Sequence, residues 1–491
     1  MLKNLRCLCI KQIENVANPA EAKNANLSEK ENLFSLSLNW TDGSNSDNSE
    51  EIIDKLEPHS DLRELEIEYY KGHRSPIWMR ELPPLYLSSL TLFNCPLWED
   101  LPFLAQMPLL NKLSLLGISK VKEVDYSFDM TRNACPFPSL EQLICDKMLK
   151  WKSWAGLLSC RGFPKLRVLK ITNCPILAEL PAMPISLFRF ELCNVGLYFL
   201  PEMYDNVGMT TGTTSPLNAS LKVVKISCCL NLQLLNGFLQ QESLEFQGIE
   251  TLIIQHCDKL VQLPTSSIGK FASLKYLEII GCPKLDPVDN ERILHFVKLQ
   301  TLVIGNCGEL DVKLLKSASH LATLASLHIV GSATINCIPS SENTFTSLRR
   351  LHIRGCDNLI QHAVMENAQG NPANNMASLK INELDISHHS LLFIEPIRSL
   401  RFVRECRIAD CSGMEALPQH WLMQNSSTLE LLTFKNARSL RSLPDTIMRL
   451  TSLKQLVIKD ATSLEQMDQI PKLPPSLFQI SITGAGGCEL V

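Results

Sequence analysis

A short pattern of apolar and polar positions recurs along the whole chain. It consists of an apolar residue, two variable residues, Leu, one variable residue, Ile or Leu, two variable residues, and then Cys or another small residue. Clear copies occupy residues 87–95, 166–174, 249–257, 274–282, 299–307 and 348–356. The end of each copy alternates apolar and polar residues, which predicts a short β-strand with one buried side. The rest of each unit must return the chain to the start of the next strand.

The second apolar anchor of the pattern defines nineteen units. These anchors are Leu8, Leu36, Leu65, Leu90, Leu113, Leu143, Leu169, Phe190, Val224, Leu252, Leu277, Leu302, Leu327, Leu351, Leu384, Cys406, Leu432, Leu456 and Ile480. Their mean spacing is about 26 residues, which lies in the range of leucine-rich repeats. A chance match would explain one or two copies, but not so many in phase.

A single unit of this length is not expected to fold alone. Ordering about 26 residues costs on the order of 26–50 kcal/mol, whereas burying roughly four or five aliphatic side chains returns only about 6–15 kcal/mol. Stacked units share a core and pair their strands in parallel. We therefore predict an α/β-type solenoid. It is a leucine-rich-repeat horseshoe, with a curved parallel β-sheet on the concave face and irregular or short-helical segments on the convex side. One solenoid over residues 1–491 is expected, not three globules.

Three stretches interrupt the regular spacing and are predicted to be loop insertions. They are residues 41–50, 202–220 and 361–378, and they are rich in polar residues and Gly. Insertions in a solenoid map to loops at one edge, often near a binding face. The alternative is that each one is a tolerated surface loop with no binding role.

Composition and charge narrow the class of protein. Hydrophobic residues make up 45 % of the chain and charged residues 20 %, so the chain is not disordered. The net charge is −4, which argues against a general affinity for nucleic acid or an anionic membrane. No apolar stretch is long enough for a membrane span, and residues 1–6 do not resemble a signal peptide. We expect a cytoplasmic protein, with the nucleus as the alternative.

The chain contains eighteen cysteines, and eight of them share one position of the repeat. These eight are Cys95, Cys174, Cys229, Cys257, Cys282, Cys307, Cys356 and Cys411; other units have Ser332, Ala437, Ala461, Val195 or Ala485 there. Interchange with small residues predicts a buried packing site with reduced thiols. Disulfides between neighbouring repeats are the alternative. There is no C-x-x-C motif, and no Cys/His cluster of the zinc type was found.

Three passages resemble the leucine-rich-repeat region of plant coiled-coil-type nucleotide-binding leucine-rich-repeat disease resistance proteins. They are residues 13–40, residues 137–154, and residues 443–456 with an echo at 263–277. Full members of that family carry a coiled coil and a nucleotide-binding switch domain with a P-loop. Neither is found here: near Gly269 and Lys270 the P-loop motif fails, because residue 264 is Pro and residue 271 is Phe. The chain opens almost inside a repeat, so we expect a truncated product, a mis-split gene or an isolated repeat domain.

No catalytic, cofactor-binding or metal-binding constellation is predicted. The sequence lacks H-E-x-x-H, G-x-S-x-G and a Gly-rich phosphate loop. The His388–His389 pair is expected to be structural, and no carboxylate pair suggests acid/base catalysis. The sequons at Asn26, Asn39, Asn218 and Asn425 are expected to stay unused. We therefore predict a binding protein and not an enzyme.

The candidate site is the concave surface of the strands. By alternation, the residues between and after the two inner anchors point to that side. The candidate partner-binding residues are Glu64, Glu66, Glu68, Tyr276, His328, Arg350, His352, Arg354, Arg407, Lys435 and Lys459. They suggest an acidic patch toward the N-terminus and a basic patch toward the C-terminus, each able to steer a complementary partner. The alternative is a solvated face without a partner.

The leading functional hypothesis is a protein-interaction scaffold of plant defence. The resemblance implies that the concave face binds a pathogen effector, a host target or the nucleotide-binding domain of a resistance protein. A second hypothesis is a repeat-type substrate receptor of a ubiquitin ligase, although no F-box-like helical segment precedes the repeats. A third is a receptor ectodomain, which requires a signal peptide and a membrane span.

Overall fold

The structure is a computed structural model of the chain, and its residues form two compact units. It describes residues 4–43, 48–81, 83–101, 104, 107–123, 136–154, 162–204, 217–235, 237–239, 244–245, 248–261, 271–286, 296–341, 343–369, 379–464 and 472–484. Unit 1 is Met1–Phe271 and unit 2 is Ala272–Val491. A single solenoid over residues 1–491 stays a prediction.

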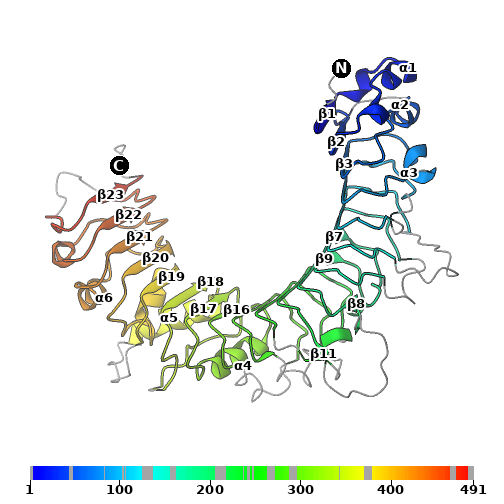
Figure 1. Ribbon diagram of the computed structural model, residues 1–491. Helices are drawn as coiled ribbons and strands as arrows, with labels where there is room; N and C mark the ends of the chain where they lie inside the picture. The colour runs from blue at the N-terminus through cyan, green and yellow to red at the C-terminus, as the bar shows by residue number, and fades with distance from the viewer. Residues whose placement is uncertain are drawn as a thin grey trace. The chain divides into compact units, whose positions relative to one another are not determined.

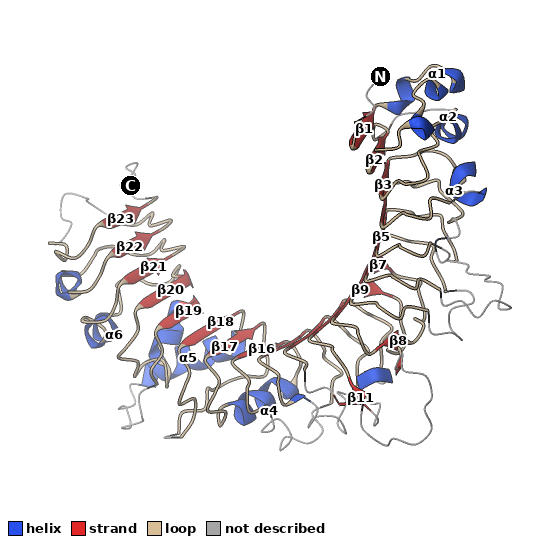
Figure 2. Cartoon of the chain, in the orientation of Figure 1, coloured by secondary structure: helices blue, strands red, loops and turns tan. Residues whose placement is uncertain are grey.

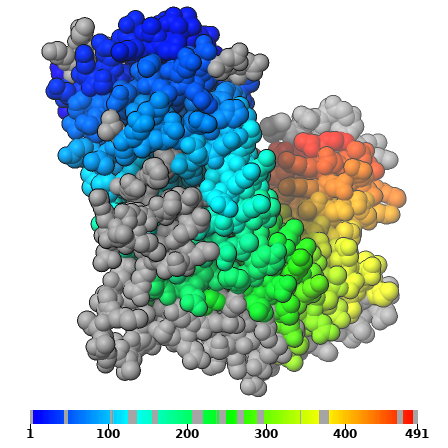
Figure 3. Space-filling model, turned by 90° about the vertical axis from the view of Figure 1, so that its right-hand side faces the viewer, coloured from blue at the N-terminus to red at the C-terminus, as the bar shows by residue number. Residues whose placement is uncertain are grey.

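The strands of unit 1 pair in parallel, each with the strand of the next repeat (Figure 1). They are β1 (Cys7–Lys11), β2 (Ser35–Asn39), β3 (Glu64–Glu68), β4 (Ser89–Phe93), β5 (Lys112–Leu116), β6 (Gln142–Asp146), β7 (Val168–Cys174), β9 (Arg189–Val195), β12 (Val223–Ser227) and β14 (Thr251–Gln255). Two short parallel pairs lie apart from them: β8 (Met183–Pro184) with β10 (Met203–Tyr204), and β11 (Leu217–Asn218) with β13 (Leu244–Glu245). In the space-filling view, successive repeats of unit 1 form adjoining bands from blue to green (Figure 3).

Unit 2 repeats the same arrangement. Its strands are β15 (Tyr276–Ile280), β16 (Thr301–Gly305), β17 (Ser326–Val330), β18 (Arg350–Arg354), β19 (Glu383–His388), β20 (Glu405–Asp410), β21 (Leu431–Phe434), β22 (Gln455–Ile458) and β23 (Gln479–Ile482). Each pairs in parallel with the next along the chain. The predicted leucine-rich-repeat solenoid is thereby confirmed.

The register of the strands confirms the predicted anchors. Within each unit every anchor faces the anchor of the next repeat, as in Leu36 with Leu65 and Leu351 with Leu384. The anchors are buried except Leu8 in β1 and Ile480 in β23, which are partly exposed. Shifting the pairing of a strand by one residue would turn its apolar side chains toward solvent. Burial of the apolar row therefore fixes the register.

Helices occupy the side of each unit opposite its strands (Figure 2). In unit 1 they are α1 (Pro19–Lys23), α2 (Ser49–Lys55) and α3 (Ile77–Glu81), with 3₁₀ turns η1 (Ile13–Asn15), η2 (Leu27–Glu29) and η5 (Gly237–Leu239). In unit 2 they are α4 (Glu309–Ala318), α5 (Asp357–Gln369) and α6 (Gln419–Gln424), with 3₁₀ turns η8 (His389–Phe393) and η9 (Asp445–Arg449). Among the described residues, no helix has the length and apolar character needed to cross a membrane.

In most repeats the residue four positions after the anchor adopts a left-handed backbone, and in most of these it is Asn, Asp or Gly. This position is occupied by Asn94, Asn173, Asn194, Asn306, Asn436 and Asp460, and by Gly117, Gly281, Gly331 and Gly355, all with positive φ. Gly carries no Cβ and Asn and Asp tolerate this conformation, so these residue types turn the chain away from the sheet at low cost. The sequence pattern treated this position as variable, although its Asn and Gly preference was visible.

The predicted buried cysteine position is confirmed. All eight cysteines of the repeat position are buried, and each cysteine in the described residues is a free thiol. The thiols close the turn: Cys95 Sγ, for example, donates to the carbonyl oxygen of Phe93 at 3.4 Å. Burial raises the pKa of the Cys95, Cys174, Cys229 and Cys411 thiols to about 12. These four thiols are therefore protonated and serve as packing groups, and the small alternates Ser332, Ala437, Ala461 and Val195 are buried at the same position.

Two of the predicted insertions are partly helical, which corrects their description as loops. Residues 49–50 begin α2, whose Glu50 and Glu51 complement the positive end of the helix while Ile52 and Ile53 are buried. Residues 361–369 belong to α5, whose Leu359 and Ala363 are buried four positions apart on one helix face. The parts at 44–47 and 370–378 lie outside the described residues.

The third insertion, residues 202–220, is tied to the solenoid at both described ends. Tyr204 accepts a hydrogen bond from the Phe163 backbone N–H at 3.1 Å, and β10 pairs with β8. On the other side of the gap, β11 pairs with β13. Residues 205–216 lie outside the described residues.

Candidate functional site

The strand face of unit 2 carries a row of side chains between the buried anchors. In register across β15 to β21, this row consists of Glu278, Val303, His328, His352, Asp385, Arg407 and Thr433. We call this row and its flanking strand residues the polar strand face. Regular strands fix the positions of these side chains, as the alternation predicts.

Two histidines stack at the middle of the polar strand face. The rings of His328 and His352 are stacked, with centroids 4.2 Å apart and nearly parallel planes at an interplanar angle of 6°. His328 Nε2 lies 2.9 Å from the Ser326 hydroxyl. Burial, followed by the like charges of His352 and Arg350, lowers the pKa of His328 from 6.5 to about 4. His328 is therefore neutral near pH 7.

Asp385 joins two of the predicted cations. Arg354 Nη2 donates to Asp385 Oδ2 at 2.6 Å, and His352 Nδ1 lies 3.7 Å from the same oxygen. Burial acts to raise the pKa of Asp385, but the hydrogen bonds and charges of His352 and Arg354 outweigh it and hold the pKa at about 2. Asp385 is not among the residues predicted for the site. Its place between the buried Leu384 and Ile386 was the signal that could have found it.

The remaining predicted residues of unit 2 differ in their partners. The Tyr276 hydroxyl donates to Glu278 Oε2 at 2.6 Å, and burial together with Glu278 raises the pKa of Tyr276. Arg407 Nη2 pairs with Glu405 Oε2 at 2.7 Å. Arg350, Lys435 and Lys459 are exposed. None of these three forms an ion pair within the described part of the chain.

The predicted basic patch is therefore a surface of mixed charge. Arg354 and Arg407 each bind a carboxylate that the sequence interpretation had not included. Three predicted cations remain without a partner carboxylate, and they lie on β18 and just after β21 and β22. Such a surface favours a partner with its own pattern of acidic and polar groups over a uniformly acidic one.

The predicted acidic patch lies on β3 of unit 1. Glu64, Glu66 and Glu68 share the exposed side of the strand, while Leu65 and Ile67 are buried. Asn39 of the neighbouring strand donates its side-chain amide to Glu68. Burial, and then the charge and hydrogen bond of Glu66, raise the pKa of Glu68. The like charges of Glu66 and Glu68 therefore repel each other along this strand.

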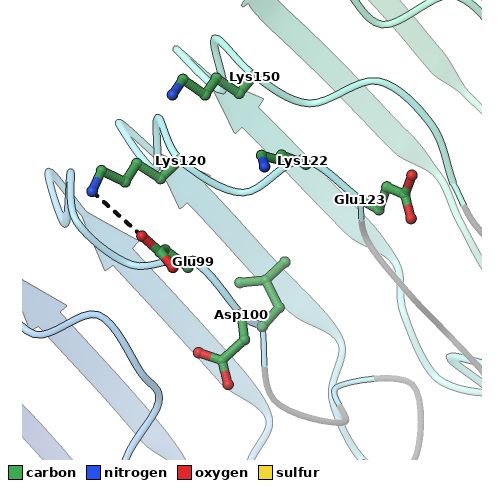
Figure 4. A pocket seen from close by; sticks show the side chains of 7 residues that line it. Glu99, Asp100, Lys120, Lys122, Glu123 and Lys150 are labelled. Atoms are coloured by element: carbon green, nitrogen blue, oxygen red, sulfur yellow. Dashed lines mark hydrogen bonds and ion pairs between the residues drawn. The ribbon is translucent and has the colours of Figure 1, made fainter.

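An open cavity of about 600 Å³ lies at the strand-end edge of unit 1, and the sequence interpretation did not identify it. Its lining residues follow β4, β5 and β6: Glu99, Asp100, Leu101, Lys120, Lys122, Glu123 and Lys150 (Figure 4). We call it the edge cavity. Loops between repeats build it, and these loops carry no periodic signal.

No metal centre is found in the part of the chain that the structure describes. No group of three or more His, Cys, Asp or Glu residues there is placed to hold an ion. His388 has the expected structural role, because its Nδ1 accepts from the Ser390 N–H at 3.2 Å at the start of η8. Asn425 is fully buried, which makes its sequon inaccessible.

The repeat register and the exposed strand residues define a leucine-rich-repeat protein. Residues 1–118 match the family described as R13L1/DRL21 LRRs. The chain is 30 % identical to the disease resistance RPP13-like protein 1 of Arabidopsis thaliana over 291 residues. The match covers 52 % of this chain and 27 % of that protein. Disease resistance protein RGA2 of Solanum bulbocastanum is 34 % identical over 239 residues, covering 46 % of this chain and 23 % of that protein.

These matches confirm the predicted resemblance to the leucine-rich-repeat region of plant disease resistance proteins. The chain spans about a quarter of the length of these two relatives. Among solved structures, a leucine-rich-repeat protein of Leptospira interrogans aligns over 97 % of this chain and 90 % of its own, at 16 % identity and a TM-score of 0.33.

Proposed function

We propose that this chain is a protein-recognition scaffold of plant defence and that the polar strand face of unit 2 binds the partner. The observation that carries the proposal is the set of charged and histidine side chains presented on rigid parallel strands. The sequence similarity of the chain to plant disease resistance proteins supports the defence role. The partner is a pathogen effector, a host target or the nucleotide-binding domain of a resistance protein. The role is binding and not catalysis.

Two features of the polar strand face suit it to recognition. Asp385 holds Arg354 and His352 in fixed positions, so less side-chain entropy is lost when a partner binds. Arg350, in contrast, has its guanidinium exposed and without a carboxylate partner in the described residues. An acidic side chain of the partner can therefore pair with Arg350 without displacing an existing ion pair. Free thiols favour action in the cytoplasm, with the nucleus as the alternative.

Charge reversal at Arg350 tests this assignment. The tagged chain and its Arg350→Glu variant are expressed in leaf cells, and captured proteins are quantified by mass spectrometry. The matched control is Arg438→Glu, which makes the same charge change at an exposed residue in the turn after β21. We expect at least one partner to be captured by the original chain and by the control but reduced about tenfold with Arg350→Glu.

Thermal unfolding of all three proteins shows whether the fold is intact. Equal capture by the three folded proteins would contradict the placement of the site on β18. A purified nucleotide-binding domain of a plant disease resistance protein serves as a defined probe for the third class of partner. Binding of that domain that is sensitive to Arg350→Glu would assign the face to restraint of a switch domain.

A further inference from the structure

The three lysines of the edge cavity come from two neighbouring repeats, and two of them occupy equivalent places. Lys120 follows the left-handed residue Gly117 by three positions, and Lys150 follows the left-handed residue Lys147 by three positions. Lys122 lies two residues after Lys120, and its carbonyl oxygen accepts from the Lys152 N–H at 2.8 Å, which links the two loops. The repeat geometry therefore brings three ammonium groups to one hollow.

Among the described residues, the carboxylates of the edge cavity form an ion pair with only one of its three lysines. Asp100 accepts from the Ser75 N–H at 3.2 Å and from its hydroxyl at 3.4 Å, which directs the carboxylate to another repeat. Glu99 lies 3.4 Å from Lys120 Nζ and 3.4 Å from His73 Nδ1. In Figure 4 the Glu123 carboxylate points away from the lysines.

Lys122 and Lys150 are exposed, and neither forms an ion pair with another described residue. The cavity thus offers two ammonium groups without an ion pair beside a third, Lys120, that is held only by a surface pair. The three carboxylates of the lining balance the three lysines in formal charge, but none of them pairs with Lys122 or Lys150. Exposed ion pairs of this kind are worth little, on the order of 1 kcal/mol or less. An incoming anion can therefore compete for Lys120 as well.

The lining also indicates what kind of ligand fits. Of the seven lining residues only Leu101 is apolar, so the cavity does not suit a hydrophobic molecule. Its volume of about 600 Å³ is large enough for a small molecule and not only for a single ion. Lysine ammonium groups act as point charges and are common phosphate ligands.

We propose that the edge cavity of unit 1 binds a small anion that carries more than one phosphate group. Lys122 and Lys150 contact separate phosphates, and Lys120 joins them when the anion displaces Glu99. This site lies on unit 1 and does not depend on the function proposed for the polar strand face of unit 2.

Binding of tripolyphosphate to the purified chain, measured by isothermal titration calorimetry at low salt, tests the proposal. We expect the variant Lys122→Gln/Lys150→Gln to bind about tenfold or more weakly, because each lysine contributes up to about fivefold. The matched control is Lys147→Gln/Lys152→Gln, which removes the same charge from exposed lysines beside the cavity that do not line it. The control is expected to bind within about twofold of the original chain.

A change of opposite sign strengthens the test. Glu99→Gln removes the carboxylate that competes for Lys120, so it should tighten tripolyphosphate binding by about two- to fivefold. Affinity of all variants should fall with added salt, since the site is exposed.

Three outcomes would overturn the proposal. One is that tripolyphosphate does not bind. Another is that the control pair weakens binding as much as Lys122→Gln/Lys150→Gln, which would indicate diffuse attraction to surface charge. The last is that citrate binds as tightly as tripolyphosphate, which would assign the cavity to carboxylates.

Discussion

At the residue scale, His328 illustrates how stacking repeats alters the chemistry of a side chain. On an isolated strand it would be an ordinary exposed histidine. In the solenoid, Val303 and His352 flank it in register, and Glu278, Arg350 and Asp385 are near enough to act on its charge. Burial and the neighbouring cations outweigh the two carboxylates, so the folded chain keeps His328 neutral at a pH where an unfolded chain would protonate it.

This shift predicts acid destabilisation of unit 2. The pKa of His328 is about 4 in the folded state and 6.5 as an ordinary value. Between these pH values the unfolded state binds a proton that the folded state does not bind. The free energy of unfolding should therefore fall as the pH drops from about 6.5 to about 4. Below that range the low pKa of Asp385 acts in the same direction, because protonation breaks its contacts with His352 and Arg354.

Chemical denaturation at pH 7 and pH 5 measures the effect. His328→Gln should lose less unfolding free energy between the two pH values than the original chain. His420→Gln, a change at an exposed histidine of α6, should behave as the original chain does. The same pH dependence in all three proteins would show that His328 is not responsible.

At the element scale, the loops that return the chain to the next strand are held by buried polar side chains as well as by apolar ones. Asn425, after α6, is completely buried and serves three backbone groups of its own and the preceding repeat. Its amide donates to the carbonyl oxygens of Leu400 at 2.9 Å and Trp421 at 3.0 Å, and its oxygen accepts from the Val403 N–H at 3.1 Å. The side chain substitutes for hydrogen bonds that an irregular segment cannot supply from its own backbone.

Removing that side chain should destabilise the repeat strongly. Asn425→Ala leaves buried backbone groups without partners, so the free energy of unfolding should fall by about 2–4 kcal/mol. Ser427→Ala, an exposed change two residues later, should stay within about 0.5 kcal/mol. Urea denaturation followed by circular dichroism compares the two. A loss below about 1 kcal/mol for Asn425→Ala would show that water replaces the amide.

At the scale of the whole molecule, the sequence predicted the strands well because each anchor is apolar and the period repeats. The anchors within each unit pair as predicted, including Phe190 and Cys406, which depart from the Leu consensus. The side chains on the polar strand face were also predictable from alternation. Their partners were not, because Arg354 meets Asp385 only after a connection that contains α5. No sequence pattern predicted the edge cavity, since it is formed by loops of three repeats.

Thiol chemistry tests the cysteine assignment across the whole chain. Titration of the denatured chain without reductant should count eighteen free thiols, the number of cysteines in the sequence. In the native chain the exposed Cys7, Cys9 and Cys337 should react early, while the buried thiols of the repeats should be slow. A denatured count that falls short by pairs would mean disulfides and would favour an extracellular protein.

The buried thiols that close the turns have one more consequence. Each sits in its own repeat and is shielded from solvent unless that repeat opens. The labelling rate of each thiol therefore reports how often its own repeat opens, from Cys95 to Cys411. Mass spectrometry of peptides labelled over time can time the opening of eight repeats separately, without introducing a single substitution. Comparing the labelling rates of neighbouring repeats then measures how cooperatively those repeats open.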